Sequence, residues 1–388
     1  MVITKKYLVF PVSDFVKVRE IDFYNKDKLL DDIYIKLDYI NPKYNIYYPV
    51  EKYKGMNIDV IIHPDIDFRW DQTDEPDYTF VYNCPFRPKL HFTAAFGWLN
   101  DPNGLFEYTS KVTGEKVYNM YFQYNPYGNI WGNIHWGHAV SKDLLHWEQK
   151  SSVLAPDELG MIFSGSAVVD SENRSGLKSG EEDVILIYYT AAGGTNKLSE
   201  NKKFTQCIAY SNDCGRTFVK YKENPVIQNV GNDNRDPKVV WCEEMQCYVM
   251  ALYLKEGTSS FGIFTSRDLL HWEFLQEMVI DGDAECPDLY PIYVQDGERE
   301  RKWVITAASG KYIICECSEN GFQIIQQAMP LNYTLYSYAA QTFYNVSDDR
   351  IIRMSWNRDV FFPESPFSQH MVKVRRLRTS DRVKEIFI

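Results

Sequence analysis

Apolar and polar residues alternate over much of the chain, which is the pattern of β-strands that bury one face. In residues 29–39, for example, Ile33, Ile35 and Leu37 occupy every second position. Turn-forming pairs that contain Pro, Gly or Asn separate such stretches. No stretch keeps a helical period over three turns, so the pattern predicts an all-β protein. Residues 1–80 are predicted to form a small β-sandwich-like N-terminal module.

A sequence repeat follows this region. Residues 139–148 return as residues 264–273, and residues 209–218 carry a shorter version of the same pattern. Each copy consists of an apolar strand, a Ser-x-Asp turn and an aromatic residue that begins the next strand. Copies about 55 to 70 residues apart indicate repeated four-stranded sheets. The interpretation is a five-bladed β-propeller over residues 81–360, followed by a short C-terminal extension over residues 361–388.

Three acidic motifs fall in different repeats of this predicted propeller, and each places a carboxylate beside or near a proline at a strand edge. They are Trp98–Gly104, Asn234–Pro237 and Asp283–Asp288. The innermost strands of a propeller line a central channel, so residues far apart in the sequence meet at its mouth. The motifs therefore predict one site that contains Asp101, Asp236 and Glu285.

Carboxylates grouped in this way suit glycoside hydrolysis, in which one attacks the sugar or activates water and another protonates the leaving oxygen. Glu285 is the better acid, because its side chain is longer and its neighbours are apolar. Asp101 lies among amides and is expected to stay ionised as the nucleophile. Asp236, beside Arg235, is also expected to stay ionised, to grip sugar hydroxyls and to stabilise positive charge at the transition state.

Each motif also has a purely structural interpretation. Asp101 could close an Asx-type turn on its own backbone. Arg235 and Asp236 could form an ion pair at a turn. The occurrence of three such carboxylates in successive repeats favours a shared site.

Composition narrows the classes of partner. The 388 residues suffice for about two domains. A net charge of −11 argues against a nucleic acid or an anionic membrane, which need clustered Lys and Arg, and is otherwise typical of a solvated acidic surface. Aromatic residues make up 15% of the chain, and Tyr and Trp suit the apolar faces of sugars. The predicted partner is a small sugar.

The eight cysteines are interpreted as reduced and mostly structural. Cys242/Cys247 and Cys315/Cys317 are the close pairs, and neither has the spacing of a zinc knuckle or a redox motif. No cofactor is therefore predicted.

The start of the chain, Met1–Phe10, has too short an apolar run for a signal peptide, and no sequence segment is long and apolar enough for a membrane span. A cytoplasmic location is expected for the chain as written, or secretion if a leader has been removed.

Five motifs together resemble glycoside hydrolase family 32, the family of invertases, inulinases and levanases. They cover about residues 87–360 and are Trp98–Gly104, Phe163–Ser166, Arg235–Pro237, Glu285–Pro287 and Tyr338–Phe343. The resemblance implies that Asp101 is the nucleophile, Glu285 the acid/base and Asp236 the transition-state stabiliser. It also implies retention of anomeric configuration through a covalent fructosyl-Asp intermediate, without a metal or cofactor. The carboxyl groups of Asp101 and Glu285 should then lie about 5 to 5.5 Å apart.

Further residues are predicted to contact the sugar. The expected substrate-binding residues are Asn100, Asn103, Gln123, Trp131, Phe163, Ser164, Arg235 and Trp356. Trp131 follows a glycine in a predicted loop and is interpreted as a stacking platform, whereas Trp136 is interpreted as core. Four histidines in strands or repeat turns are interpreted as structural: His135, His138, His146 and His271.

The resemblance implies an exo-acting, retaining β-fructofuranosidase for sucrose, fructo-oligosaccharides, levan or inulin. The alternatives are fructosyl transfer at the same site, an arabinan-degrading propeller glycosidase and a catalytically silent fructan-binding propeller. The family's C-terminal β-sandwich is expected to be largely absent here, and residues 367–377 are interpreted as the connection into it. The N-terminal module is expected to cover a propeller face that such a sandwich would protect. Linkage, chain-length preference and oligomeric state are left open by the motifs.

Overall fold

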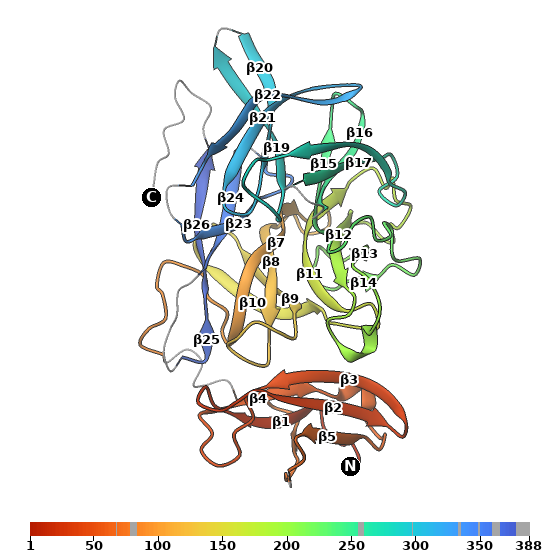
Figure 1. The fold of residues 1–388 in the computed structure, drawn as a ribbon, viewed down its shortest axis with the longest axis vertical. Helices are drawn as coiled ribbons and strands as arrows, with labels where there is room; N and C mark the ends of the chain where they lie inside the picture. The colour runs from red at the N-terminus through yellow and green to blue at the C-terminus, as the bar shows by residue number, and fades with distance from the viewer. Residues whose placement is uncertain are drawn as a thin grey trace.

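The computed structural model describes residues 1–66, 68–77, 84–254, 260–296, 298–332, 335–347, 350–358 and 365–377. Their regular structure is almost entirely β-strand (Figure 1), apart from single 3-10 turns at η1 (Glu51–Tyr53) and η3 (Lys197–Ser199). The all-β prediction is therefore confirmed.

The N-terminal module consists of two three-stranded sheets at one end of the molecule (Figure 1). Its strands are β1 (Tyr7–Val12), β2 (Arg19–Asn25), β3 (Lys28–Ile35), β4 (Tyr44–Pro49), β5 (Asp59–His63) and β6 (Asp71–Thr73). The sheet orders are β4-β1-β6 and β3-β2-β5. Phe10, Ile33 and Ile35 share one buried apolar core, which the alternation in the sequence had indicated.

The rest of the described chain forms five further sheets, of which four contain four consecutive antiparallel strands in chain order. The first sheet is built from β7 (Gly97–Thr109), β8 (Lys116–Asn125), β9 (His135–Ser141) and β10 (Trp147–Leu154), with β25 (Phe367–Ser368) beside β7. The second contains β11 (Met161–Asp170), β12 (Val184–Ala192), β13 (Thr205–Ser211) and β14 (Val219–Lys220).

The third sheet contains β15 (Arg235–Cys242), β16 (Cys247–Tyr253), β17 (Ser260–Ser266) and β18 (Glu273–Val279). The fourth contains β19 (Asp288–Asp296), β20 (Glu298–Thr306), β21 (Lys311–Ser318) and β22 (Gly321–Pro330). The fifth pairs β23 (Ser337–Thr342), β24 (Ile351–Asn357) and β26 (His370–Leu377).

The first strands of these sheets surround a common axis. β7 contacts β11, β11 contacts β15, β15 contacts β19, β19 contacts β23, and β23 contacts β7 again. Large apolar side chains fill the spaces between neighbouring sheets, with Trp136 between the first and second and Trp303 between the third and fourth. This is the propeller arrangement predicted from the repeat.

The sequence repeat is a turn that joins the third and fourth strands of a sheet. Ser141 Oγ accepts a bond of 2.8 Å from the backbone N–H three residues later, and Asp143 accepts two bonds of 2.8 Å from the N–H groups that follow. Ser266 and Asp268 make the same bonds. The leucine after each Asp is left-handed, with φ of 65° and 68°. The Ser and Asp side chains thus satisfy the backbone of a tight turn.

The N-terminal module packs against the β8–β9 and β12–β13 loops of the propeller. Asn133 exchanges bonds of 2.9 and 2.8 Å with the backbone of Tyr34. Lys197 Nζ lies 2.6 Å from Asp22 Oδ2 and 2.5 Å from Glu20 Oε1. Because β7, β8 and β9 pair antiparallel, the β8–β9 loop lies at the end where β7 begins. That the N-terminal module covers a face which the family's C-terminal sandwich would otherwise protect stays a prediction.

The interpretation of residues 367–377 as a connection is wrong. β26 pairs antiparallel with β24, so that Leu377 faces Ile351 and His370 faces Asn357. β25 pairs parallel with β7 at Gly97 and Trp98. These residues belong to the propeller sheets because their backbone groups complete two ladders. The proposed domain boundaries at residues 80/81 and 360/361 lie outside the described residues.

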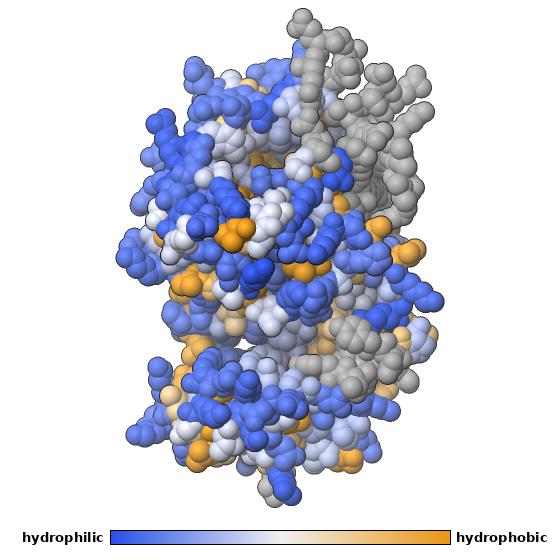
Figure 2. Space-filling model, turned by 180° about the vertical axis from the view of Figure 1, so that it is seen from behind, coloured by the Kyte–Doolittle hydropathy of each residue, from blue (hydrophilic) through white to orange (hydrophobic). Residues whose placement is uncertain are grey.

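The face of the molecule in Figure 2 is mainly hydrophilic, with apolar residues scattered among polar ones. Among the residues that the structure describes, no helix has the length and apolarity needed to cross a membrane.

Candidate active site

Irregularities in four of the axial strands direct side chains towards the mouth of the channel. The β7–β8 register shifts between Leu99 and Pro102, and the β15–β16 register shifts beside Asp236. β11 and β23 carry equivalent shifts at Ser164 and after Tyr338. Such bulges re-aim side chains next to active sites. Asp236, Glu285 and Cys286 also have left-handed backbones, with φ of 66°, 45° and 44°, a strain that concentrates at functional sites.

Asp101, on β7, is enclosed by polar partners. Ser164 Oγ donates to Asp101 Oδ2 at 2.6 Å, and Asn100 Nδ2 donates to Asp101 Oδ1 at 3.1 Å. Trp98 Nε1 holds the Asn100 oxygen at 2.9 Å. Burial raises the pKa of Asp101, and the charge of Glu285 raises it further, while the hydrogen bonds oppose the shift. The amide of Asn100 lowers the pKa as expected, but burial outweighs it.

Asp236, at the start of β15, and Asp101 both lie next to the thiol of Cys286. The backbone N–H of Cys286 donates to Asp236 Oδ2 at 3.0 Å. Cys286 Sγ lies 3.4 Å from that oxygen and 3.5 Å from Asp101 Oδ2. Burial raises the pKa of Asp236 to about 7, against the effect of Arg235. Asp236 was expected to stay ionised beside Arg235; its raised pKa runs against that expectation, because desolvation exceeds the attraction of the guanidinium.

Arg235 instead pairs with Glu285, which precedes β19. Its Nη2 and Nε atoms lie 2.6 and 3.2 Å from Glu285 Oε2, whereas its Nε lies 3.7 Å from Asp236 Oδ2. The Tyr338 hydroxyl donates to the other oxygen, Glu285 Oε1. Three carboxylates from three sheets thus converge around one guanidinium, one thiol and one phenol.

Aromatic rings stand on two sides of this cluster. Trp131 lies edge-on to Phe163 at 6.0 Å, and Phe163 lies edge-on to Phe204 at 5.4 Å. Trp98 and Tyr338 both pack edge-on to Trp356, at 6.1 and 6.0 Å. Trp131 is 52% exposed, as a stacking platform requires, and Trp136 is fully buried. The burial of Trp136 matches its interpretation as core, whereas stacking of a sugar on Trp131 stays a prediction.

Two residues that were predicted to contact the sugar are buried and form hydrogen bonds within the protein. Asn103 is fully buried, and its amide satisfies both atoms by accepting from Gln123 Nε2 at 3.0 Å and donating to Pro102 O at 3.2 Å. Asn103 therefore supports the strand behind Asp101, which corrects its assignment to the substrate. Gln123 is nearly buried and donates to Ile162 O at 2.9 Å, so its role as a sugar contact stays a prediction.

Four residues at the cluster were not predicted as site residues. Cys286 and Tyr338 lie in motifs that the sequence analysis identified, but their contacts with the carboxylates were not predicted. Thr190 Oγ1 accepts from the backbone N–H of Asp236 at 3.0 Å, and Phe204 extends the aromatic wall. Neither lies in a motif that the sequence analysis identified, because β12 and its following loop meet the site only in the folded chain.

The four histidines interpreted as structural lie in turns and buried strands. His146 and His271 bind the Asp of their own repeat turns at 2.6 and 2.7 Å. His135 bonds to Asn133 O and His138 to Asn119 Oδ1. Burial lowers the pKa of His135 to about 4 and that of His138 to about 3, so both are neutral at physiological pH.

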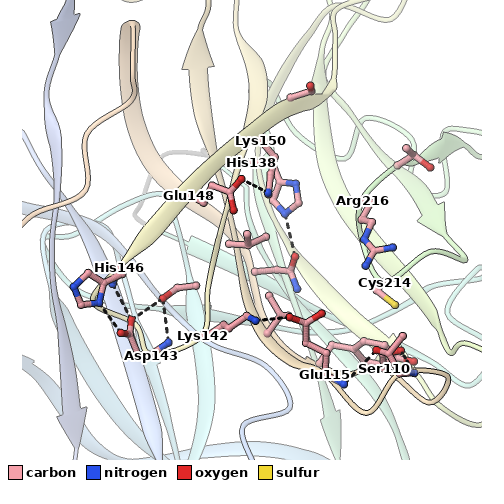
Figure 3. Close-up of a pocket in the computed structure, with 18 residues that line it drawn as sticks. Ser110, Glu115, His138, Lys142, Asp143, His146, Glu148, Lys150, Cys214 and Arg216 are labelled. Atoms are coloured by element: carbon pink, nitrogen blue, oxygen red, sulfur yellow. Dashed lines mark hydrogen bonds and ion pairs between the residues drawn. The ribbon is translucent and has the colours of Figure 1, made fainter. Parts of the chain in front are cut away.

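A separate cavity of about 910 Å³ lies over the first sheet, beside the turn after β13 (Figure 3). Its charged groups pair with one another: Lys142 lies 2.7 Å from Glu115, and His146 lies 2.6 Å from Asp143. None of the three convergent carboxylates lines it. The channel mouth, and not this cavity, is therefore the candidate active site.

Comparison with known proteins covers the part of the chain that contains these residues. The family description "Glycosyl hydrolases family 32 N-terminal domain" matches residues 91–387. A levanase from Bacillus subtilis is 43% identical over 59% of this chain and 32% of its own length. An invertase from Debaryomyces hansenii is 36% identical over 77% of this chain and 57% of its own length.

Solved structures agree on the fold. An exo-inulinase from Aspergillus awamori superposes with a TM-score of 0.67 at 30% identity, over 76% of this chain and 65% of its own. A fructofuranosidase variant from Schwanniomyces occidentalis, complexed with fructosylnystose, gives 0.65 at 33% identity, over 75% of this chain and 58% of its own. The chain spans about a third of the length of the first of these curated relatives and just over half of the length of the second.

Proposed function

The chain belongs to glycosyl hydrolase family 32, and we propose that it hydrolyses terminal β-D-fructofuranosyl units of sucrose, fructo-oligosaccharides or fructans as an exo-acting, retaining enzyme. The observation that carries this proposal is the convergence of Asp101, Asp236 and Glu285 from three sheets on one channel mouth. Retaining glycosidases need a nucleophilic carboxylate and an acid/base carboxylate on the two sides of the scissile bond.

Asp101 is the proposed nucleophile. Its Oδ2 atom attacks the anomeric carbon while the bond from that carbon to the leaving oxygen breaks, and Glu285 gives its proton to that oxygen. The hydrogen bonds from Ser164 and Asn100 fix the direction of Asp101 before the reaction. Preorganisation of this kind lowers the barrier, since the protein does not have to rearrange as the bond forms.

Glu285 is the proposed acid and then base. In the second step it takes a proton from water, the water oxygen attacks the anomeric carbon, and the bond to Asp101 breaks. Tyr338 holds one oxygen of Glu285 in place. Arg235 holds the other oxygen, and sugar hydroxyls that attract this guanidinium would leave Glu285 free to carry the proton.

Asp236 is proposed to bind the hydroxyl groups of the sugar ring. It is buried and feels the charges of the other two carboxylates, and one of its oxygens is fixed by the Cys286 backbone. Bonds from Asp236 to ring hydroxyls would strengthen as positive charge builds on the ring. The aromatic rings of Trp131, Phe163 and Trp356 offer apolar surfaces for the sugar.

The names of related proteins support this substrate class. Levanase, invertase and exo-inulinase are the names of proteins that share 36 to 43% identity with this chain. A related Schwanniomyces enzyme has been solved in complex with fructose. Transfer of fructose to a second sugar uses the same covalent intermediate, so acceptor specificity decides between the two outcomes.

The test is release of fructose and glucose from sucrose, kestose, inulin and levan by the wild type and by Asp101→Asn. We expect the substitution to lower kcat by about 10³-fold or more, because the covalent step loses its nucleophile. Glu148→Gln, an exposed carboxylate on β10, is the matched control and should retain activity.

A wild type that binds fructose but cleaves none of the four sugars would contradict hydrolysis and favour a silent binding propeller. Trisaccharides that accumulate from sucrose would favour transfer. Cleavage of arabinosides alone would favour an arabinan-degrading enzyme.

A further inference from the structure

A second cluster of polar and titratable side chains, with atoms that could ligate a metal ion, lies at the opposite end of β15 from Asp236. The sequence places Cys242 beside Cys247 and Cys315 beside Cys317, but the fold brings Cys242 together with Cys317. Cys242 ends β15 in the third sheet, and Cys317 lies near the end of β21 in the fourth. Glu244, in the turn after β15, joins them.

The three ligand atoms have the spacing of ligands around one ion. The sulfurs of Cys242 and Cys317 lie 3.5 Å apart, and Cys242 Sγ lies 3.4 Å from Glu244 Oε2. All three atoms lie within 4.8 Å of one another. A tetrahedral zinc ion with ordinary bond lengths separates two sulfurs by about 3.7 Å and a sulfur from an oxygen by about 3.5 Å. The cluster therefore needs little movement to accept such an ion.

Neighbouring groups hold the carboxylate in a ligating orientation. Trp303 Nε1 donates to Glu244 Oε1 at 3.2 Å, and Arg301 Nε lies 3.6 Å from the same oxygen. The other oxygen, Oε2, is left to face the thiols. The backbone N–H of Met245 also points to the Cys242 sulfur. Outer partners that fix one atom of a ligand and leave the other free are typical of metal sites.

Charge and access are consistent with a divalent ion. Two thiolates and one carboxylate carry three negative charges, of which Arg301 offsets one. A divalent cation would balance the remaining two. Cys242 is fully buried and Cys317 is half-buried, so the cluster is reached from solvent on the Cys317 side.

We propose that Cys242, Glu244 and Cys317 bind one zinc ion, or another divalent ion that prefers sulfur, and that the ion fastens the third sheet to the fourth. The site lies about 20 Å along β15 from Asp236. Its role is structural and independent of the proposed hydrolysis. Spacing within the sequence could not indicate it, because each close cysteine pair contributes only one ligand.

The test is titration of the reduced, chelator-treated protein with Co²⁺, followed by Zn²⁺. We expect one Co²⁺ per chain, a sulfur-to-cobalt absorption band in the near ultraviolet, and loss of that band when Zn²⁺ is added. Bound Zn²⁺ should also raise the Tm, since it binds only the folded chain.

Cys317→Ser should weaken binding at least 100-fold, and Glu244→Gln by about 10- to 100-fold. Cys317 is chosen over the fully buried Cys242 so that the variant folds, which its circular dichroism spectrum will verify. Cys84→Ser, a half-buried cysteine outside the cluster, is the control and should bind like the wild type.

Three results would overturn the proposal. The first is the absence of stoichiometric Co²⁺ uptake by the reduced wild type. The second is equal uptake by Cys317→Ser. The third is a Cys242–Cys317 disulfide in the isolated protein together with no metal uptake after its reduction.

Discussion

The pKa values of the aspartates in the repeat turns and of those at the channel mouth are shifted in opposite directions. In the turns, the backbone N–H and side chain of His271 lower the pKa of Asp268 to about 2, although partial burial opposes the shift. The backbone N–H of His146 likewise lowers the pKa of Asp143. At the channel mouth, burial raises the pKa of Asp236 to about 7 and also raises the pKa of Asp101.

The difference shows what distinguishes a structural carboxylate from a reactive one in the same fold. A turn carboxylate remains partly solvated and accepts backbone N–H groups, so its charge is stabilised. A site carboxylate is desolvated next to carboxylates of the same sign. Its charge is costly because of this desolvation, and a sugar that becomes positive at the transition state relieves that cost.

The largest effect is expected for Asp236→Asn. The folded pKa of Asp236 lies near 7 and the unfolded value near 3.8, so protonation favours the folded state. The stability from this group is complete below pH 3.8 and is lost as the pH rises through 7. Its loss amounts to about 4 kcal/mol at most. Asparagine cannot ionise, so the variant should gain Tm relative to the wild type between pH 4 and pH 8.

Thermal unfolding of both proteins across this pH range measures the effect. Glu148→Gln serves as the control, because its carboxylate is exposed. A difference in Tm between Asp236→Asn and the wild type that does not change with pH would contradict the assignment of desolvation as the dominant cause.

A smaller effect of opposite sign is expected for Asp268→Ala. The substitution removes the acceptor of two backbone N–H groups and should cost about 1 kcal/mol at pH 7. The folded pKa is lowered, so this stability is present above pH 3.8 and is lost as the pH falls towards 2. Urea unfolding at pH 7 and pH 3 should show the difference narrowing, with fructose release unchanged. An activity loss would show that the turn affects the site.

The smallest effect is expected for Trp131→Ala at the rim. This half-exposed ring has no part in proton transfer, so its removal should raise KM about 2- to 10-fold and leave kcat nearly unchanged. Phe274→Ala, an exposed ring on the outer strand β18, is the control. Initial rates over a range of sucrose concentrations separate the two constants. A fall in kcat alone would mean that Trp131 orients the reacting bond.

Local patterns predicted much of the fold. The alternation through Ile33 and Ile35 identified a real strand, because burial of one sheet face imposes a period of two. The repeat at residues 139–148 and 264–273 identified a real turn, since its Ser and Asp bind neighbouring backbone. The convergence of distant acidic motifs followed from the geometry of a propeller.

What the sequence could not predict depends on contacts between sheets. The preference of Arg235 for Glu285 over its neighbour Asp236 is set by side-chain direction in a bulged strand. The burial that raises the pKa of Asp236 comes from several sheets at once. The meeting of Cys242 and Cys317, 75 positions apart, has no local signal either.

The parallel pairing of β25 with β7 has a consequence for the order of events during synthesis. The backbone N–H of Gly97 bonds to Pro366 O at 2.8 Å, four residues before Asp101. A ribosome must therefore extend the chain past Pro366 and Ser368 before the strand that carries Asp101 acquires this neighbour. Until this segment is made, the first sheet of the propeller lacks the strand that pairs with β7. We therefore expect formation of the active site and closure of the ring of sheets to coincide.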